Sequence, residues 1–167
     1  MDTMDRYKVD LKGMTEDTVS YRWLLEDNFF SAVQGPEIRQ GTLDVSLRVK
    51  RTHEGYDLDF QIDGTVKVEC DRCLALMDLP IHTRQDLTVR LGEVYDDDGE
   101  VIVIAESSGV IDLAWHIYEI AALQIPIRHV HPDGECDAEV MARLRPEGPK
   151  EVDPRWAALA KLKNNNN

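Results

Sequence analysis

The stretch 43-LDVSLRVKRTHEGYDLDFQI-62 has the clearest strand pattern of the sequence. Apolar residues occupy every second position from 43 to 49 and again from 56 to 62, and polar residues fill the positions between them. A period of two is typical of a strand with one buried face. Glu54 and Gly55 mark a turn between the two runs. The stretch therefore predicts an antiparallel hairpin.

Further strands are expected on both sides of this hairpin. Apolar, β-branched or aromatic patterns predict them at residues 7–11, 18–25, 79–91 and 101–104. A short helix at residues 28–33 would bury Phe29 and Phe30. Gly64 interrupts the alternation of the second hairpin strand, which predicts a β-bulge there.

The main helix is expected between Asp112, as its N-cap, and Ile125, where Pro126 stops it. Its apolar residues cover a wide arc, so it should be buried. A further short helix is expected at residues 138–144. Together these patterns predict the fold class α+β, mainly antiparallel β-sheet with one buried helix and a short C-terminal helix.

Residues 1–145 are expected to form one domain, and residues 146–167 a linker with a docking helix or tail. Asp153 and Pro154 are typical of a helix start. Trp156, Leu159 and Leu162 would then form a narrow apolar stripe. Six residues are predicted to bind a partner: Asp153, Pro154, Arg155, Trp156, Leu159 and Leu162. The alternatives are docking on the domain itself and a surface peptide without a partner.

Composition excludes several classes of protein. Hydrophobic residues make up 43% of the 167 and charged residues 31%, so a core and a solvated surface can both form. No apolar run is long enough for a transmembrane helix. The N-terminal residues are acidic and lack the apolar region of a secretory signal. We therefore expect a cytoplasmic protein without a membrane partner.

The net charge of −13 is unevenly distributed along the chain. Residues 1–142 hold 13 basic and 29 acidic residues, a net −16, whereas residues 143–167 hold 6 basic and 3 acidic residues, a net +3. Nucleic-acid binding depends on lysines and arginines that contact phosphates. The acidic body therefore favours a protein partner, with RNA contact limited to the basic tail.

The clearest candidate for a chemical site is the CxxC motif Cys70-Asp71-Arg72-Cys73. Two residues between cysteines let both thiolates bind one metal ion from a tight turn. His131 and Cys136 follow 58 or more residues later across a predicted turn, and His129 is a spare. Cys70, Cys73, His131 and Cys136 would together make a Cys₃His zinc site. Three buried or idle cysteines remain the alternative.

A redox role of the CxxC is the competing chemical interpretation. Thioredoxin-like sites place the motif at the N-terminus of a helix, which lowers the pKa of one thiol. Here the motif lies between two predicted strands. The sequence also lacks the P-loop, nucleophile-elbow and zinc-protease motifs. We therefore expect a protein that is not an enzyme.

Four segments in order resemble the YceD family, the large ribosomal RNA subunit accumulation proteins. They are residues 63–66 leading into 70–74, residues 111–113 with 125–127, residues 130–131 with Cys136, and residues 153–159 with 162–163. The resemblance runs from about residue 5 to the C-terminus. The two cysteines of the family match Cys70 and Cys73, and its later histidine and cysteine match His131 and Cys136.

The resemblance implies a role in the accumulation of large-subunit ribosomal RNA. The partner would be a ribosomal protein or a pre-ribosomal particle, and a ribosomal protein would suit the acidic body because ribosomal proteins are basic. Direct binding of precursor RNA is the rival. A CxxC-based redox or metal-handling protein and a generic adaptor are the alternatives outside ribosome assembly.

Overall fold

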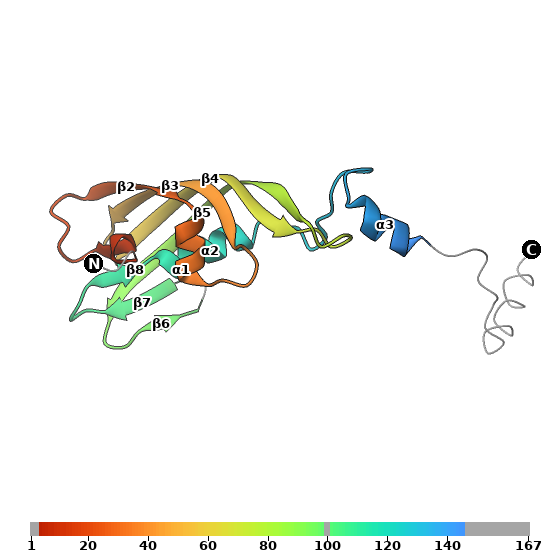
Figure 1. Cartoon of the computed structure of the whole chain (residues 1–167). Coiled ribbons are helices and arrows are strands. Elements are labelled where there is room, and N and C mark those ends of the chain that lie inside the picture. Colours follow the sequence, from red (N-terminus) through yellow and green to blue (C-terminus); the bar gives the residue numbers. More distant parts are fainter. Residues whose placement is uncertain (1–3, 99–100, 146–167) are drawn as a thin grey trace, which may run out of the picture. The chain divides into compact units, whose positions relative to one another are not determined.

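The computed structural model describes residues 4–98 and 101–145, and its contacts divide the chain into a unit of residues 1–130 and a unit of residues 131–167. The elements of the first unit are a 3₁₀ helix at Asp5–Tyr7, β1 (Lys8–Asp10), β2 (Thr18–Leu25), α1 (Asp27–Val33), β3 (Gln40–Arg51), β4 (Tyr56–Glu69), β5 (Leu76–Gly92), β6 (Asp96–Asp97), β7 (Val101–Ala105), β8 (Val110–Asp112) and α2 (Ala114–Ala122) (Figure 1). The second unit contains α3 (Ala138–Leu144). The predicted boundary at residue 145 stays a prediction.

The first unit is built on a six-stranded sheet in the order β2-β3-β4-β5-β7-β6. All neighbours are antiparallel except β5 and β7, which run parallel. The predicted hairpin is confirmed as β3 and β4, with Leu47 opposite Phe60. A separate two-stranded sheet pairs β1 with β8. The structure thus has the predicted α+β class with a mainly antiparallel sheet.

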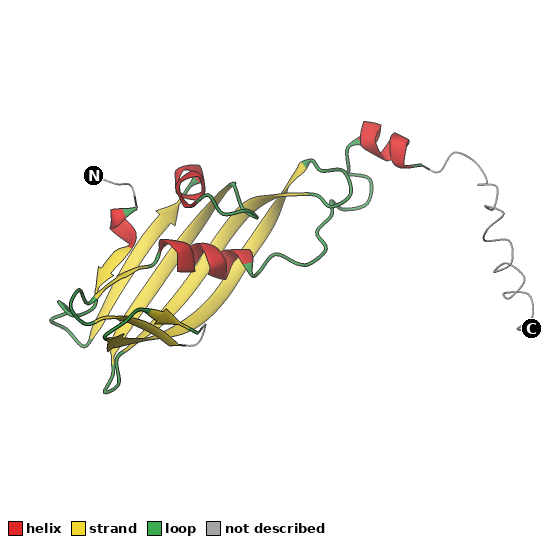
Figure 2. Cartoon of the chain, turned by 90° about the horizontal axis from the view of Figure 1, so that it is seen from below, coloured by secondary structure: helices red, strands yellow, loops and turns green. Residues whose placement is uncertain are grey.

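Helices α1 and α2 lie over the same face of the sheet (Figure 2). The inward side chains of the strands pack beneath them, and Phe29 and Phe30 of α1 are each 1% exposed. The hydroxyl of Tyr118 on α2 accepts hydrogen bonds from the backbone N–H groups of Glu37 and Ile38 at 2.8 and 3.1 Å. This hydroxyl joins α2 to the loop that follows α1, so both helices hold one core.

The predicted main helix is present as α2 and is buried, but its predicted ends are wrong. It begins at Ala114 and ends at Ala122. Asp112 belongs to β8, where it pairs with Lys8, and Leu113 takes the N-cap position. The Asp112 carboxylate still accepts a hydrogen bond from the Ala114 N–H at 3.0 Å. The helix begins later because strand pairing takes Asp112. It ends earlier because the N–H groups of Gln124 and Ile125 donate to carbonyls three residues back, which makes turns rather than α-helix.

The predicted bulge at Gly64 is also wrong. The pairing of β4 with β3 and β5 continues through this residue without an offset, so that Gly64 lies opposite Leu43 on one side and Ile81 on the other. Its φ of +153° lies in a region that only glycine adopts readily. A Cβ atom here would lie 2.2 Å from the carbonyl oxygen of Thr42. Gly64 therefore permits close approach of two strands.

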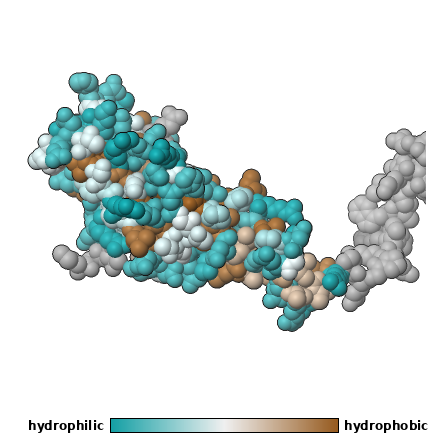
Figure 3. Space-filling view, turned by 90° about the horizontal axis from the view of Figure 1, so that it is seen from above, coloured by the Kyte–Doolittle hydropathy of each residue, from teal (hydrophilic) through white to brown (hydrophobic). Residues whose placement is uncertain are grey.

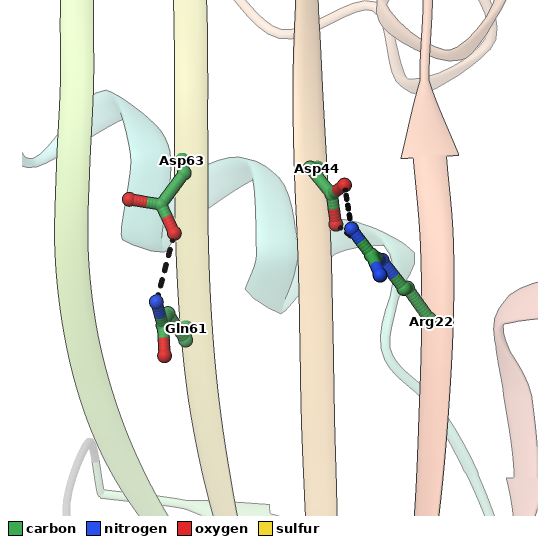
Figure 4. A network of polar contacts seen from close by, with 4 residues as sticks. All are labelled: Arg22, Asp44, Gln61 and Asp63. Carbon is green, nitrogen blue, oxygen red and sulfur yellow. Dashed lines mark hydrogen bonds and ion pairs between the residues drawn. The ribbon is translucent and has the colours of Figure 1, made fainter.

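The other face of the sheet is polar. Hydrophilic side chains predominate over the strands on the side opposite to that of Figure 2 (Figure 3). Arg22 of β2 donates to both carboxylate oxygens of Asp44 on β3, at 2.9 and 2.6 Å, and lowers the pKa of that carboxyl (Figure 4). Hydrogen bonds from Gln61, at 3.0 Å, and from His82 likewise lower the pKa of Asp63 on β4.

These pairs occupy most of the basic side chains of that face. Arg48 forms an ion pair with Asp59 at 2.7 Å, and Lys67 forms one with Asp78 at 2.8 Å. Exposed ion pairs of this kind stabilise a fold by only about 0–1 kcal/mol. Their consequence is electrostatic, because several cations of this face, Arg22, Arg48 and Lys67, lie against carboxylates, which reduces the positive surface available to RNA.

The second unit is described as far as residue 145. Helix α3 has the predicted bounds, and the Asp137 carboxylate caps it by accepting from the N–H groups of Glu139 and Val140 at 2.9 and 3.1 Å. The predicted docking helix at residues 153–163, with its partner-binding residues, lies outside the described residues.

Candidate metal centre

The CxxC motif forms a tight turn between β4 and β5. The N–H of Leu74 donates to the carbonyl of Cys70 at 2.8 Å, and the N–H of Cys70 donates to the carbonyl of Ala75 at 2.9 Å. Leu74 has a left-handed backbone with φ of +62°. The turn therefore brings Cys73 back toward Cys70, as the spacing predicted.

Both thiols of this turn are shielded from solvent. Cys70 is 0% and Cys73 5% exposed. The N–H of Arg72 points at the Cys70 sulfur at 3.4 Å, and such a donor favours a thiolate. All three cysteines lie in the described part of the chain, and none of them forms a disulfide. Buried thiols with an amide donor are suited to metal ligation.

Asp71, inside the CxxC, is held against a distant residue of the same unit. Its N–H donates to the carbonyl of His129 at 2.9 Å, and its carboxylate accepts from the N–H of His129 at 2.8 Å. The imidazole of His129 lies 3.7 Å from the same carboxylate and 2.9 Å from the carbonyl of Pro126. The spare histidine of the motif thus fixes the chain two residues before His131.

His131 and Cys136 form the second pair of candidate ligands. The N–H of Glu135 donates to the carbonyl of Pro132 at 3.0 Å, which closes the predicted turn with Gly134 at φ +89°. The turn leaves the Cys136 sulfur 4.0 Å from the Nδ1 atom of His131.

One ligand atom from each of Cys70, Cys73, His131 and Cys136 lies within 4.8 Å of the other three. Ligands at 2.0–2.3 Å from one zinc ion are roughly 3.3–3.8 Å apart in a tetrahedron. A small contraction would therefore close the four around one ion. The donor set of three sulfurs and one imidazole also fits, since zinc prefers these ligands. The predicted clustering is confirmed, and the four residues fit a metal ion.

The surroundings of the CxxC do not favour redox catalysis. The motif follows a strand and precedes another, with no helix beginning at either cysteine. A helix N-terminus is what lowers the thiol pKa in thioredoxin-like sites. With ligand partners nearby, the thiols are better placed to hold an ion than to exchange disulfides.

Acidic and histidine side chains elsewhere in the described residues have local structural roles. Asp98, which follows β6, accepts from the N–H of Val101 at 2.7 Å. His82 pairs with Asp63 on the outer face, and His116 is buried in α2. The only group of three or more metal-ligating side chains found in residues 4–98 and 101–145 is the Cys₃His set.

The family model for the large ribosomal RNA subunit accumulation protein YceD matches residues 58–163. The chain belongs to the YceD family. The matched range covers most of β4 and every candidate metal ligand. It confirms the family that the sequence resembles, over residues 58–163 rather than from about residue 5. No curated protein and no solved structure matches the chain. Among its described helices, none is long and apolar enough to cross a membrane.

Sequence reasoning missed one contributor to this centre. Asp71 was visible only as a residue between two cysteines, and its pairing with His129 joins positions 58 residues apart. A spacer residue of a CxxC that carries a carboxylate is a usable signal, because it can accept a backbone N–H from another loop. Which residue pairs with such a carboxylate can be known only from the folded structure.

Proposed function

We propose that this protein is a non-enzymatic factor in assembly of the large ribosomal subunit, and that it supports accumulation of the ribosomal RNA by binding a basic ribosomal protein. The single observation that carries the proposal is the family match over residues 58–163. The family match supports the process, which is accumulation of large-subunit ribosomal RNA. The partner is inferred from the charge of the chain.

The distribution of charge favours protein over RNA as the direct partner. The body of residues 1–142 has a net charge of −16. On the polar sheet face several basic side chains are paired with carboxylates, as for Arg48 with Asp59 and Lys67 with Asp78. Such a surface repels phosphates and attracts the basic surfaces of ribosomal proteins. Precursor RNA is the second candidate, with contact through the basic residues beyond 142.

We further propose that Cys70, Cys73, His131 and Cys136 bind a structural zinc ion. A closed set of four protein ligands leaves no position for substrate, which is the property of structural rather than catalytic zinc. The clustering of the ligand atoms within 4.8 Å supports this assignment. The ion would hold the loop of residues 131–136 at the CxxC turn.

The C-terminal segment is proposed as a second docking element. Asp153, Pro154, Arg155, Trp156, Leu159 and Leu162 would form a short amphipathic helix on the partner. An isolated helix of about 12–15 residues is already marginal in water, so a segment of this length needs a surface to fold on. Lys161 and Lys163 would lie near the C-terminal end of that helix, where positive charges interact favourably with the helix dipole.

Association with ribosomal particles tests the proposed function. Full-length protein should co-sediment with precursors of the large subunit, and cells that lack the gene should have a lowered ratio of large- to small-subunit ribosomal RNA. A Trp156→Ala/Leu159→Ala variant should retain its fold by circular dichroism and lose most of this co-sedimentation. Lys150→Ala, in the linker just before this segment, is the control.

Two results would count against the proposal. A normal ratio of ribosomal RNAs in cells without the gene would remove the role in assembly. Unfolding of the Trp156→Ala/Leu159→Ala variant would place the segment in the core and remove its role as a docking helix.

A further inference from the structure

We propose that an apolar groove beside α2 binds a basic amphipathic helix of the protein partner. This inference rests on the proposed function and names the surface and the chemistry of the partner. All of its lining residues belong to the unit of residues 1–130.

The groove is a hollow of ≈ 710 Å³ between α2, β5 and β7. Leu87, Ile102 and Ile120 line it. The chain that leaves α2 adds four further apolar residues: Leu123, Ile125, Pro126 and Ile127. Leu123 is 81% exposed and Ile127 is fully exposed. Large apolar side chains that stand together in solvent mark surfaces that bind a partner.

A second hollow of ≈ 580 Å³ continues this surface along α2. Tyr95 and the half-exposed Trp115 line it, and both hollows share Asp97, His116 and Glu119. The apolar surface therefore follows the helix, whose nine residues correspond to a length of about 14 Å. That length suits two or three turns of a docked helix, the usual partner of such a groove.

The charges around the groove have one sign. Glu37, Asp97 and Glu119 line it, and among the described residues no lysine or arginine lines either hollow. Burial and the carboxylates of Asp97, Glu119 and Asp96 raise the pKa of Tyr95, which agrees with a negative potential at this edge. The groove therefore combines an apolar floor with an acidic rim.

This combination selects among the possible occupants. RNA phosphates would be repelled by the rim, and a second copy of this chain carries the same net charge of −13. A helix with apolar residues on one side and lysines or arginines beside them satisfies both the floor and the rim. Ribosomal proteins supply such segments because they are basic.

A defined peptide tests the groove in the full-length protein. The probe is a fluorescein-labelled amphipathic peptide of roughly 18 lysine and leucine residues with leucines three and four apart. Fluorescence anisotropy should show binding to the wild-type chain, and Glu119→Lys/Leu123→Ser should weaken it at least about tenfold. Glu16→Lys/Leu24→Ser makes the same two changes at exposed positions outside the groove and should change affinity by less than about twofold.

Three results would overturn the inference. The first is an unchanged affinity of the groove variant for the peptide, and the second is equal binding of a peptide in which glutamate replaces lysine. The third is an affinity for the peptide that rises about tenfold in the Trp156→Ala/Leu159→Ala variant, because this would mean that the chain's own C-terminal segment occupies the groove. Failure of the proposed function is a separate result. A groove that binds the peptide as expected, in a protein that never sediments with ribosomal particles, would refute ribosome assembly and leave the groove standing.

Discussion

The Cys70→Ser/Cys73→Ser variant should lose the metal ion entirely. The wild-type protein should hold about one zinc ion per chain, because its three sulfurs and one imidazole complete a tetrahedral set. Serine hydroxyls are poor zinc ligands, and two of four ligands would be lost. Elemental analysis of the purified proteins should show about one zinc ion per chain in the wild type and almost none in the variant.

The same variant should lose local structure around the CxxC turn. The ligands come from separate loops, so the free energy of zinc binding contributes to the folding of those loops. Amide hydrogen exchange should become fast at residues 70–75 and 129–136, whereas the strands should remain protected by their own core.

Two histidines of one loop supply the matched control. His131→Ala should weaken zinc binding strongly, and His129→Ala should retain the ion because its ring contacts Asp71 and Pro126 rather than the ligand set. Stoichiometric zinc in the double serine variant, or none in the wild type purified with zinc present, would contradict the assigned ligands.

Gly64→Ala should lower the free energy of unfolding by about 1–3 kcal/mol, the usual cost of a side chain in a backbone region reserved for glycine. The overlap adds to this cost, since the new Cβ would lie 2.2 Å from the carbonyl oxygen of Thr42. Relief would require β3 and β4 to separate at the centre of the sheet. Urea unfolding followed by circular dichroism measures the effect.

Thr65→Ala is the neighbouring control for this change. Thr65 is exposed on the same strand, and a surface substitution there should stay within about 0.5 kcal/mol. If Gly64→Ala were equally neutral, the close contact of the two strands at this position would be refuted.

Local patterns were sufficient to predict most strands but not how they pair. The alternation at residues 43–49 and 56–62 predicted β3 and β4 because one face of each is buried. The parallel pairing of β5 with β7 could not be predicted, since period-two patterns carry no direction. Asp112 has the chemistry of a helix cap, yet its pairing with Lys8, far along the chain, assigns it to a strand.

The candidate metal centre was more predictable than the groove. Cys70 and Cys73 lie in one turn, and His131 and Cys136 lie in another, so two short motifs were enough to name the ligands. The groove combines residues of the loop after α1, of β5, β7 and α2, and of the chain beyond α2. No continuous stretch contains it, and its acidic rim is indistinguishable in sequence from ordinary solvated surface.

A direct comparison of partners tests whether this acidic chain works in ribosome assembly by binding a ribosomal protein rather than RNA. Full-length protein would be titrated at physiological salt with purified large-subunit ribosomal proteins and, separately, with fragments of the precursor RNA. We predict that at least one ribosomal protein binds at least about tenfold more tightly than any RNA fragment. Tight RNA binding that persists when Arg143, Arg145 and Lys150 are replaced by alanine, with no ribosomal protein bound, would contradict it.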